Sequence, residues 1–176
     1  QILRRLIADI ADVEQVDDAP VVHRTSVDIA ALARAIAHAR VAHDSVKKLS
    51  LNFSATKNAD AIVTDRDLVE RVIWIFADNA CRNAPVSSEV RAEVKSDGKE
   101  LTVAFTDSGP ALPATHIPHV FTIDYRAWAK QRDGRPGRGL SLPFTHLALS
   151  RLGGNVAVDS PTPDTTRFSF TLPRIS

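Results

Sequence analysis

One helical segment of the sequence places an amide, a guanidinium and a second amide on the same face. Asn79, Arg82 and Asn83 recur at spacings of three and four residues, and side chains with this spacing are neighbours on a helix surface. A neutral amide oxygen suits Mg²⁺, which keeps several waters and takes few protein ligands. An arginine can bind phosphate through two parallel hydrogen bonds. The alternative is a plain helix stop with a solvated arginine, which the segment taken alone favours.

A carboxylate on a glycine turn follows 28 positions after Asn79. The turn, Asp107-Ser108-Gly109-Pro110, comes directly behind the strand-like residues 101–106. Glycine permits the backbone geometry of a turn beside a ligand, and a carboxylate there could accept the exocyclic amine of adenine. We expect Asp107 to lie at a ligand turn outside the core. Asp-Ser-Gly alone is a common turn, but together the two segments predict a magnesium nucleotide pocket.

A long basic loop precedes the last helical segment. The loop contains a single acidic residue, Asp133, and five basic ones. The basic residues are Arg126, Lys130, Arg132, Arg135 and Arg138. The loop runs through Gly137-Arg138-Gly139 into a helix start, whose free N–H groups and dipole favour anions. The alternatives are a solvated loop or a basic patch for nucleic acid. Only Tyr125 and Trp128 could stack on bases nearby, so we expect no nucleic acid partner.

Composition limits the protein classes that fit. A chain of 176 residues, 44% hydrophobic, can bury one core. Its net charge of +1 gives no overall attraction to nucleic acid or a membrane. The single cysteine, Cys81, excludes an internal disulfide and fits a reducing compartment, so we expect a cytoplasmic location. No run of about 18 apolar residues occurs, so we expect no membrane contact by this chain. The start at Gln1 inside a helical pattern predicts a piece of a longer protein.

Hydrophobic periodicity predicts the elements that must position these residues. Helical spacing is found at residues 2–13, 29–46, 66–84 and 142–152, with a short helical piece at 116–121. Strand patterns occupy residues 21–27, 49–53, 61–64, 89–95, 101–106, 155–159 and 167–172. Asp28 and Asp65 are expected to cap the helices that follow them. Strands and helices alternate without regular βαβ spacing, so we expect a two-layer α/β sandwich with a mixed sheet packed on helices.

Taken in order, these segments resemble the catalytic, ATP-binding domain of sensor histidine kinases, within the ATPase superfamily that includes gyrase and MutL. The motifs carrying the resemblance are 64–85 (N box), 107–113 (first glycine box), 117–126 (phenylalanine box) and 137–142 (second glycine box). Each motif is weak alone, and their joint order and spacing make the match specific. Residues 1–18 look like the end of a dimerisation helix and linker, and 19–176 like the catalytic domain with its Bergerat-type fold.

The resemblance implies a site and partners. Asn79 would be the Mg²⁺ ligand, and Asn79 and Arg82 would be the catalytic residues. Asp107 would accept a hydrogen bond from adenine. The residues that would contact ATP are Asn79, Arg82, Asn83, Asp107, Gly109, Ala111, Tyr125, Arg126, Gly137, Arg138, Gly139, Leu140, Ser141 and Thr166. The domain would pass the ATP γ-phosphate to a histidine on an upstream dimerisation helix, for relay to a response regulator receiver domain. The whole protein would be a homodimer, in the cytoplasm or as the cytoplasmic part of a membrane-anchored sensor.

Four positions depart from the family pattern. Ile75 replaces an earlier N-box asparagine, Ala111 and Ser141 replace glycines, and Asp124 stands where a second phenylalanine is usual. These departures motivate the alternative of a degenerate, non-catalytic module that signals through protein interaction. Hydrolysis of the gyrase or MutL kind needs an acidic residue one turn before the helix asparagine, and Ile75 cannot supply it.

Overall fold

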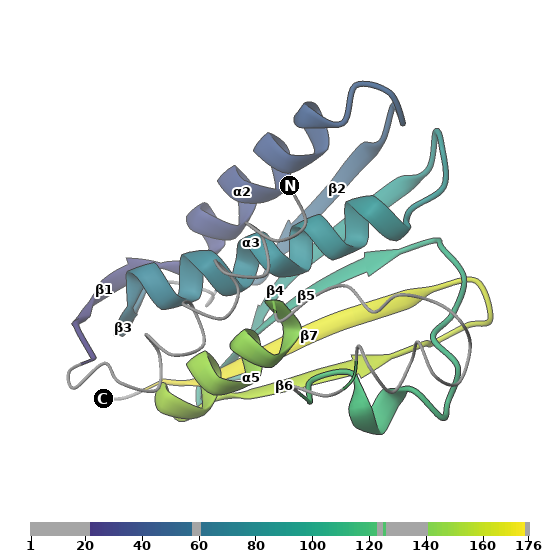
Figure 1. Ribbon diagram of the computed structural model, residues 1–176. Coiled ribbons are helices and arrows are strands. Elements are labelled where there is room, and N and C mark those ends of the chain that lie inside the picture. The colour runs from purple at the N-terminus through teal and green to yellow at the C-terminus, as the bar shows by residue number, and fades with distance from the viewer. Residues whose placement is uncertain (1–21, 58–60, 123–124, 126–140, 175–176) are drawn as a thin grey trace, which may run out of the picture.

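A mixed five-stranded sheet carries three helices on one face. The computed structural model describes residues 22–57, 61–122, 125 and 141–174. The sheet order is β2-β4-β5-β7-β6, with β2 parallel to β4 and the other neighbours antiparallel. Its strands are β2 (Ser50–Ala55), β4 (Glu89–Ser96), β5 (Glu100–Asp107), β6 (Asn155–Asp159) and β7 (Thr166–Pro173). Among the described residues, the helices are α2 (Ile29–His43), α3 (Arg66–Asn83) and α5 (Ser141–Arg151) (Figure 1). The expected two-layer sandwich with a mixed sheet is confirmed.

A smaller ribbon sits beside the main sheet. β1 (Arg24–Asp28) pairs antiparallel with β3 (Ala61–Asp65), and each strand leads directly into a helix. The Asp28 side chain accepts the Ala31 N–H at 2.9 Å, and the Asp65 side chain accepts the Leu68 N–H at 3.2 Å. Both N-caps are therefore confirmed. The short helical piece is a single 3₁₀ turn, η1 (Ile117–His119).

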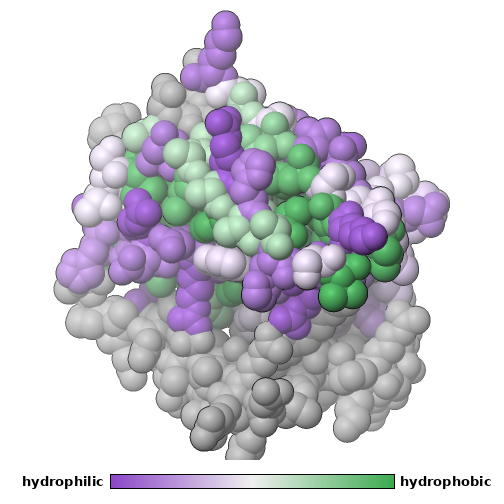
Figure 2. Space-filling model, turned by 90° about the horizontal axis from the view of Figure 1, so that it is seen from above, coloured by the Kyte–Doolittle hydropathy of each residue, from purple (hydrophilic) through white to green (hydrophobic). Residues whose placement is uncertain are grey.

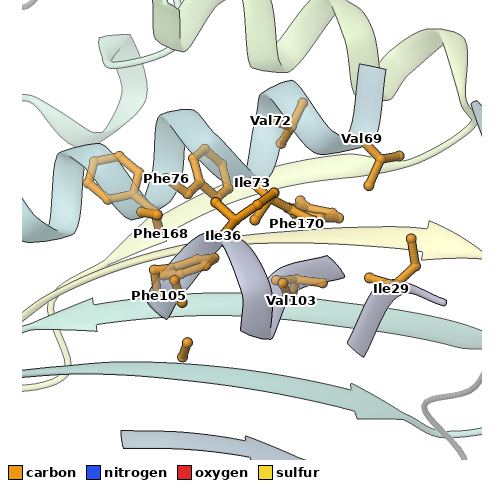
Figure 3. Close-up of a cluster of buried hydrophobic side chains, with 14 of the residues drawn as sticks. Ile29, Ile36, Val69, Val72, Ile73, Phe76, Val103, Phe105, Phe168 and Phe170 are labelled. Carbon is orange, nitrogen blue, oxygen red and sulfur yellow. The ribbon is translucent and has the colours of Figure 1, made fainter. Parts of the chain in front are cut away.

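The core lies between the helices and the sheet. Val72, Ile73 and Phe76 of α3 are completely buried. The Phe76 ring lies 5.7 Å from that of Phe168 and 5.9 Å from that of Phe170 on β7, within the distance range of favourable aromatic pairs. Figure 3 shows these rings meeting the side chains of α2 and β5. The core therefore fixes α3 over the middle of the sheet.

The end of α2 differs from the prediction. The pattern extends to Val46, but the helix stops at His43. The Asp44 carboxylate accepts the Lys47 N–H at 3.2 Å, which turns the chain. Lys47 Nζ then donates to the carbonyls of Cys81, Arg82 and Ala84 at 3.0, 2.6 and 2.9 Å. A cation at a helix C-terminus is favourable, so this lysine stabilises the end of α3. Helix α2 ends three residues earlier than predicted.

The surface seen from above carries both hydrophobic and hydrophilic residues. Hydrophobic residues gather near its middle, with hydrophilic ones around them (Figure 2). The most exposed large hydrophobic side chains among the described residues are Val46, Val63, Trp74 and Val86. Within the described ranges, no helix combines the length and apolar character needed to cross a membrane. The expected helix at the start of the chain and the basic loop from Arg126 to Arg138 lie outside the described residues.

Candidate functional site

The two motifs meet where α3 and β5 end. Asn83 Nδ2 donates to Asp107 Oδ1 at 2.6 Å, and the Gly109 N–H donates to the same oxygen at 2.8 Å. Asp107 is only 1% exposed. The expectation that it lies outside the core is wrong, because Leu101, Val103, Phe105 and Asp107 alternate along β5 onto its buried face. The site therefore places a carboxylate in the protein interior.

The close contact with Asn83 leaves room only for a glycine at position 109. A Cβ at Gly109 would lie 2.3 Å from the Asn83 carbonyl oxygen and 2.6 Å from its side-chain nitrogen. These distances are too short for any side chain. The predicted glycine thus allows the turn to pack directly on the end of α3.

Strand β7 supports this turn from the other side. Thr166 pairs with Asp107 in the β5–β7 register and is 1% exposed. Its hydroxyl donates to the Pro110 carbonyl at 3.2 Å, and the Ala111 N–H donates to the Pro163 carbonyl at 3.2 Å. Both predicted residues therefore lie beside the turn, where they hold its backbone.

Asn79 lies one helical turn before Asn83 and is 7% exposed. It follows Phe76 by three positions, so it borders the apolar face of α3. Its Nδ2 is buried and has no hydrogen-bond partner among the described residues. Buried polar atoms in proteins are nearly always paired, so a bound ligand would explain this unpaired amide. An amide can present its oxygen to a metal or its nitrogen to a phosphate, and Asn79 thus fits a magnesium nucleotide.

Arg82 is held by residues that the sequence analysis did not single out. Its Nε lies 2.6 Å from Asp78 Oδ2, and the other Asp78 oxygen accepts from Arg40 Nε of α2 at 2.8 Å. The i,i+4 spacing of Asp78 and Arg82 is visible in the sequence. Arg40 is 38 positions from Asp78 and gives no such signal.

Of the two predicted ATP contacts in the phenylalanine box, Tyr125 and Arg126, the structure describes Tyr125. Its hydroxyl lies 3.0 Å from His116 Nδ1, and the two rings meet edge to face with centroids 5.8 Å apart. His116 is 5% exposed and was not predicted as a site residue. It belongs to the turns around η1, where sequence patterns carry little information.

The remaining predicted residues are only partly described. Ser141 is the first residue of α5. The other five, Arg126, Gly137, Arg138, Gly139 and Leu140, lie outside the described residues. Cys81, between Asn79 and Arg82, is buried, and its burial raises the pKa of the thiol to about 11. It is therefore a protonated core residue at neutral pH.

Comparison with known proteins gives a family and a fold. A model described as histidine kinase-, DNA gyrase B-, and HSP90-like ATPase matches residues 64–176. The adaptive-response sensory kinase SasA of Synechocystis sp. is 27% identical over 176 residues, covering 98% of this chain and 45% of that protein. The chain therefore spans less than half the length of this relative.

Solved structures show the same architecture. Full-length ShkA in complex with AMPPNP matches with a TM-score of 0.81 at 20% identity, over 96% of this chain and 35% of ShkA. The catalytic domain of the histidine kinase ThkA matches with a TM-score of 0.74 at 15% identity, over 86% of this chain and 96% of that domain. At 20% and 15% identity, these matches show that the fold is shared.

Proposed function

The chain belongs to the family of histidine kinase-, DNA gyrase B- and HSP90-like ATPases, and we propose that it is the ATP-binding catalytic part of a sensor histidine kinase. One observation carries the proposal. The Asn83–Asp107 hydrogen bond joins two residues 24 positions apart in the sequence, and this contact supports one site for the residues that we propose to bind magnesium and adenine.

Asp107 would recognise adenine. The Asn83 amide and the Gly109 N–H fix Oδ1 of its carboxylate, so the group is held before ligand arrives. A preorganised acceptor needs little reorganisation on binding. The exocyclic amine of adenine is a donor, so its chemistry matches a buried carboxylate.

Asn79 and Arg82 would bind the phosphates. The orphaned Asn79 amide is available to Mg²⁺ or to a phosphate oxygen. Arg82 is 40% exposed and uses only its Nε in the contact with Asp78, while a guanidinium carries five N–H donors. Bound ATP supplies the transferable phosphoryl group, and the protein contributes positioning and charge neutralisation. Both residues lie on α3, whose place is fixed by the core.

The acceptor and partners follow from the family. We propose that the γ-phosphate passes to a histidine on an upstream dimerisation helix and then to the receiver domain of a response regulator. Two relatives support this proposal: SasA, which is named a sensory kinase, and IrlS, which is named a sensor protein. We propose that the whole protein acts as a homodimer on the cytoplasmic side. The burial of Asn79 and Asp107 and the close packing of Gly109 support the catalytic proposal over the non-catalytic alternative.

Calorimetry with magnesium ADP tests the proposal. We expect binding in the micromolar to low-millimolar range, and we expect Asn79→Ala to remove it. Asn52→Ala is the matched control, because Asn52 lies on β2 in contact with Glu89, far in sequence from either motif. Binding that survives Asn79→Ala would remove this residue from the site. Absence of any binding by the unsubstituted chain would overturn the proposed function.

A further inference from the structure

We propose that Arg40 of α2 is a positioning residue for the phosphate contact of Arg82, acting through Asp78. The inference rests on the proposed function and deepens it. The three residues form one chain of contacts: Arg40 Nε to Asp78 Oδ1 at 2.8 Å, and Asp78 Oδ2 to Arg82 Nε at 2.6 Å. One carboxylate therefore faces both arginines, one oxygen each.

Arg40 is built into the protein in a way that a surface arginine is not. It is 9% exposed, and its Nη1 is buried with no hydrogen-bond partner among the described residues. Asp44 Oδ2 lies 3.9 Å from that nitrogen. A buried charge is tolerated only when it is paired, so Arg40 depends on Asp78 and Asp78 is fixed in place by Arg40.

The charges of the cluster balance around Asp78. The cluster contains two arginines, Arg40 and Arg82, and two aspartates, Asp44 and Asp78. Without Arg40, Asp78 would interact with Arg82 alone and the cluster would carry one excess negative charge. That charge would oppose a nucleotide phosphate, and Arg82 would be drawn toward Asp78. Arg40 thus leaves the charge of Arg82 free to act on phosphate.

Neighbouring contacts make α2 and α3 one unit at this end. Lys47 donates to the last carbonyls of α3, so the backbone at Arg82 is also fixed from the turn that follows α2. Lys47 holds the backbone of Arg82, and Asp78 holds the side chain of Arg82. This division predicts that loss of Arg40 disturbs the Arg82 side chain while the helix stays in place.

The test measures affinities of the chain for ATP and adenosine by calorimetry in Arg40→Met, Arg82→Met and the double variant. We expect Arg40→Met to weaken ATP binding about tenfold, or about 1.4 kcal/mol, and to leave adenosine binding unchanged. In the Arg82→Met background, the same substitution should have little further effect on ATP, because coupled residues are not additive. Arg34→Met is the matched control, since Arg34 lies on the same helix but stacks on Phe53.

Three outcomes would overturn the inference. Equal losses for ATP and adenosine would mean that Arg40 only supports the fold. A tenfold loss that persists without Arg82 would mean that Arg40 acts independently of it. Unchanged ATP affinity in Arg40→Met would remove the role altogether. If Arg40→Met does not fold, Arg40→Lys serves instead; it keeps the charge but loses the guanidinium geometry, and should weaken ATP binding while leaving adenosine binding unchanged.

Failure of this inference is distinguishable from failure of the proposed function. If the unsubstituted chain binds no ATP, the proposed function fails first. If it binds ATP and Arg82→Met weakens that binding while Arg40→Met does not, only the role of Arg40 is lost.

Discussion

Asn83 and Asp107 join the end of α3 to the end of β5 through a 2.6 Å hydrogen bond from Asn83 Nδ2 to Asp107 Oδ1. The Gly109 N–H reaches the same oxygen at 2.8 Å, so the carboxylate is held by a helix and by its own turn. Such a buried, charge-assisted pair is stronger than a neutral hydrogen bond. The contact therefore serves both the fold and the proposed adenine site.

Asp107→Asn should weaken adenine nucleotide binding by about 1.5–3 kcal/mol, because a charged acceptor is lost. It should also lower the free energy of unfolding by about 1–3 kcal/mol, since two donors then face a weaker partner. Calorimetry and urea denaturation measure the two effects. Asp97→Asn, on the exposed hairpin turn, is the control for nucleotide affinity. An unchanged dissociation constant would exclude Asp107 from the pocket.

Asn79→Ala should abolish binding of magnesium nucleotide while changing the free energy of unfolding by less than about 1 kcal/mol. Its side-chain nitrogen is buried without a partner among the described residues, so its loss breaks no hydrogen bond there and relieves an unpaired polar group. Asn83→Ala is the matched comparison, since it removes the bond to Asp107. Equal destabilisation by the two substitutions, measured by urea denaturation, would contradict this assignment.

Gly109→Ala should destabilise the protein by about 1–3 kcal/mol, as overpacking does, and should weaken nucleotide binding. The added Cβ would lie 2.3 Å from the Asn83 backbone oxygen, which cannot move without the end of α3. Gly98→Ala is the control that separates loss of stability from an effect at the proposed nucleotide site. Gly98 has φ of +92° but open space around it, so it should cost about 1–2 kcal/mol without any change in nucleotide affinity. Normal nucleotide binding by Gly109→Ala would place the ligand elsewhere.

Cys81 should make stability fall at alkaline pH. Its pKa is about 11 in the folded protein against an ordinary value of 9.0, so above pH 9 the unfolded chain loses a proton that the folded protein keeps. The free energy of unfolding should then fall by about 1.4 kcal/mol for each pH unit between about 9 and 11. Urea denaturation from pH 8 to 10.5 measures this slope. Subtracting the curve of Cys81→Ala removes the contributions of lysine and tyrosine, and identical slopes would disprove the role of the thiol.

Ala111→Gly combined with Ser141→Gly should raise ATP affinity modestly, by about 1 kcal/mol. The resembling kinases have bare backbone at these two positions, and here each carries a side chain. The gain is limited because each glycine also makes the free site more flexible, and ordering it on binding costs entropy. Titration with ATP against each single variant measures it. If affinity stays the same or falls, the two residues are adaptations of a working site.

The sequence by itself determined the elements and the identity of the motifs. Alternating and helical spacings of apolar residues located β5, β7 and α3 within one or two residues, because burial on one face imposes these periods. Capping aspartates Asp28 and Asp65 marked two helix starts, since their side chains bond to N–H groups only three residues on. These signals are local, so they can be read without knowing the fold.

Only the tertiary structure decided how the site is held. The burial of Asp107, the bond from Asn83 and the contact of Arg40 with Asp78 join residues 24 to 38 positions apart. A polar residue that is buried because a distant partner compensates it looks, in the sequence, like any exposed one. The same reason explains the early end of α2, where Lys47 is drawn to carbonyls more than 30 positions away. Long-range pairing is set by packing of helices on the sheet, and no local pattern encodes it.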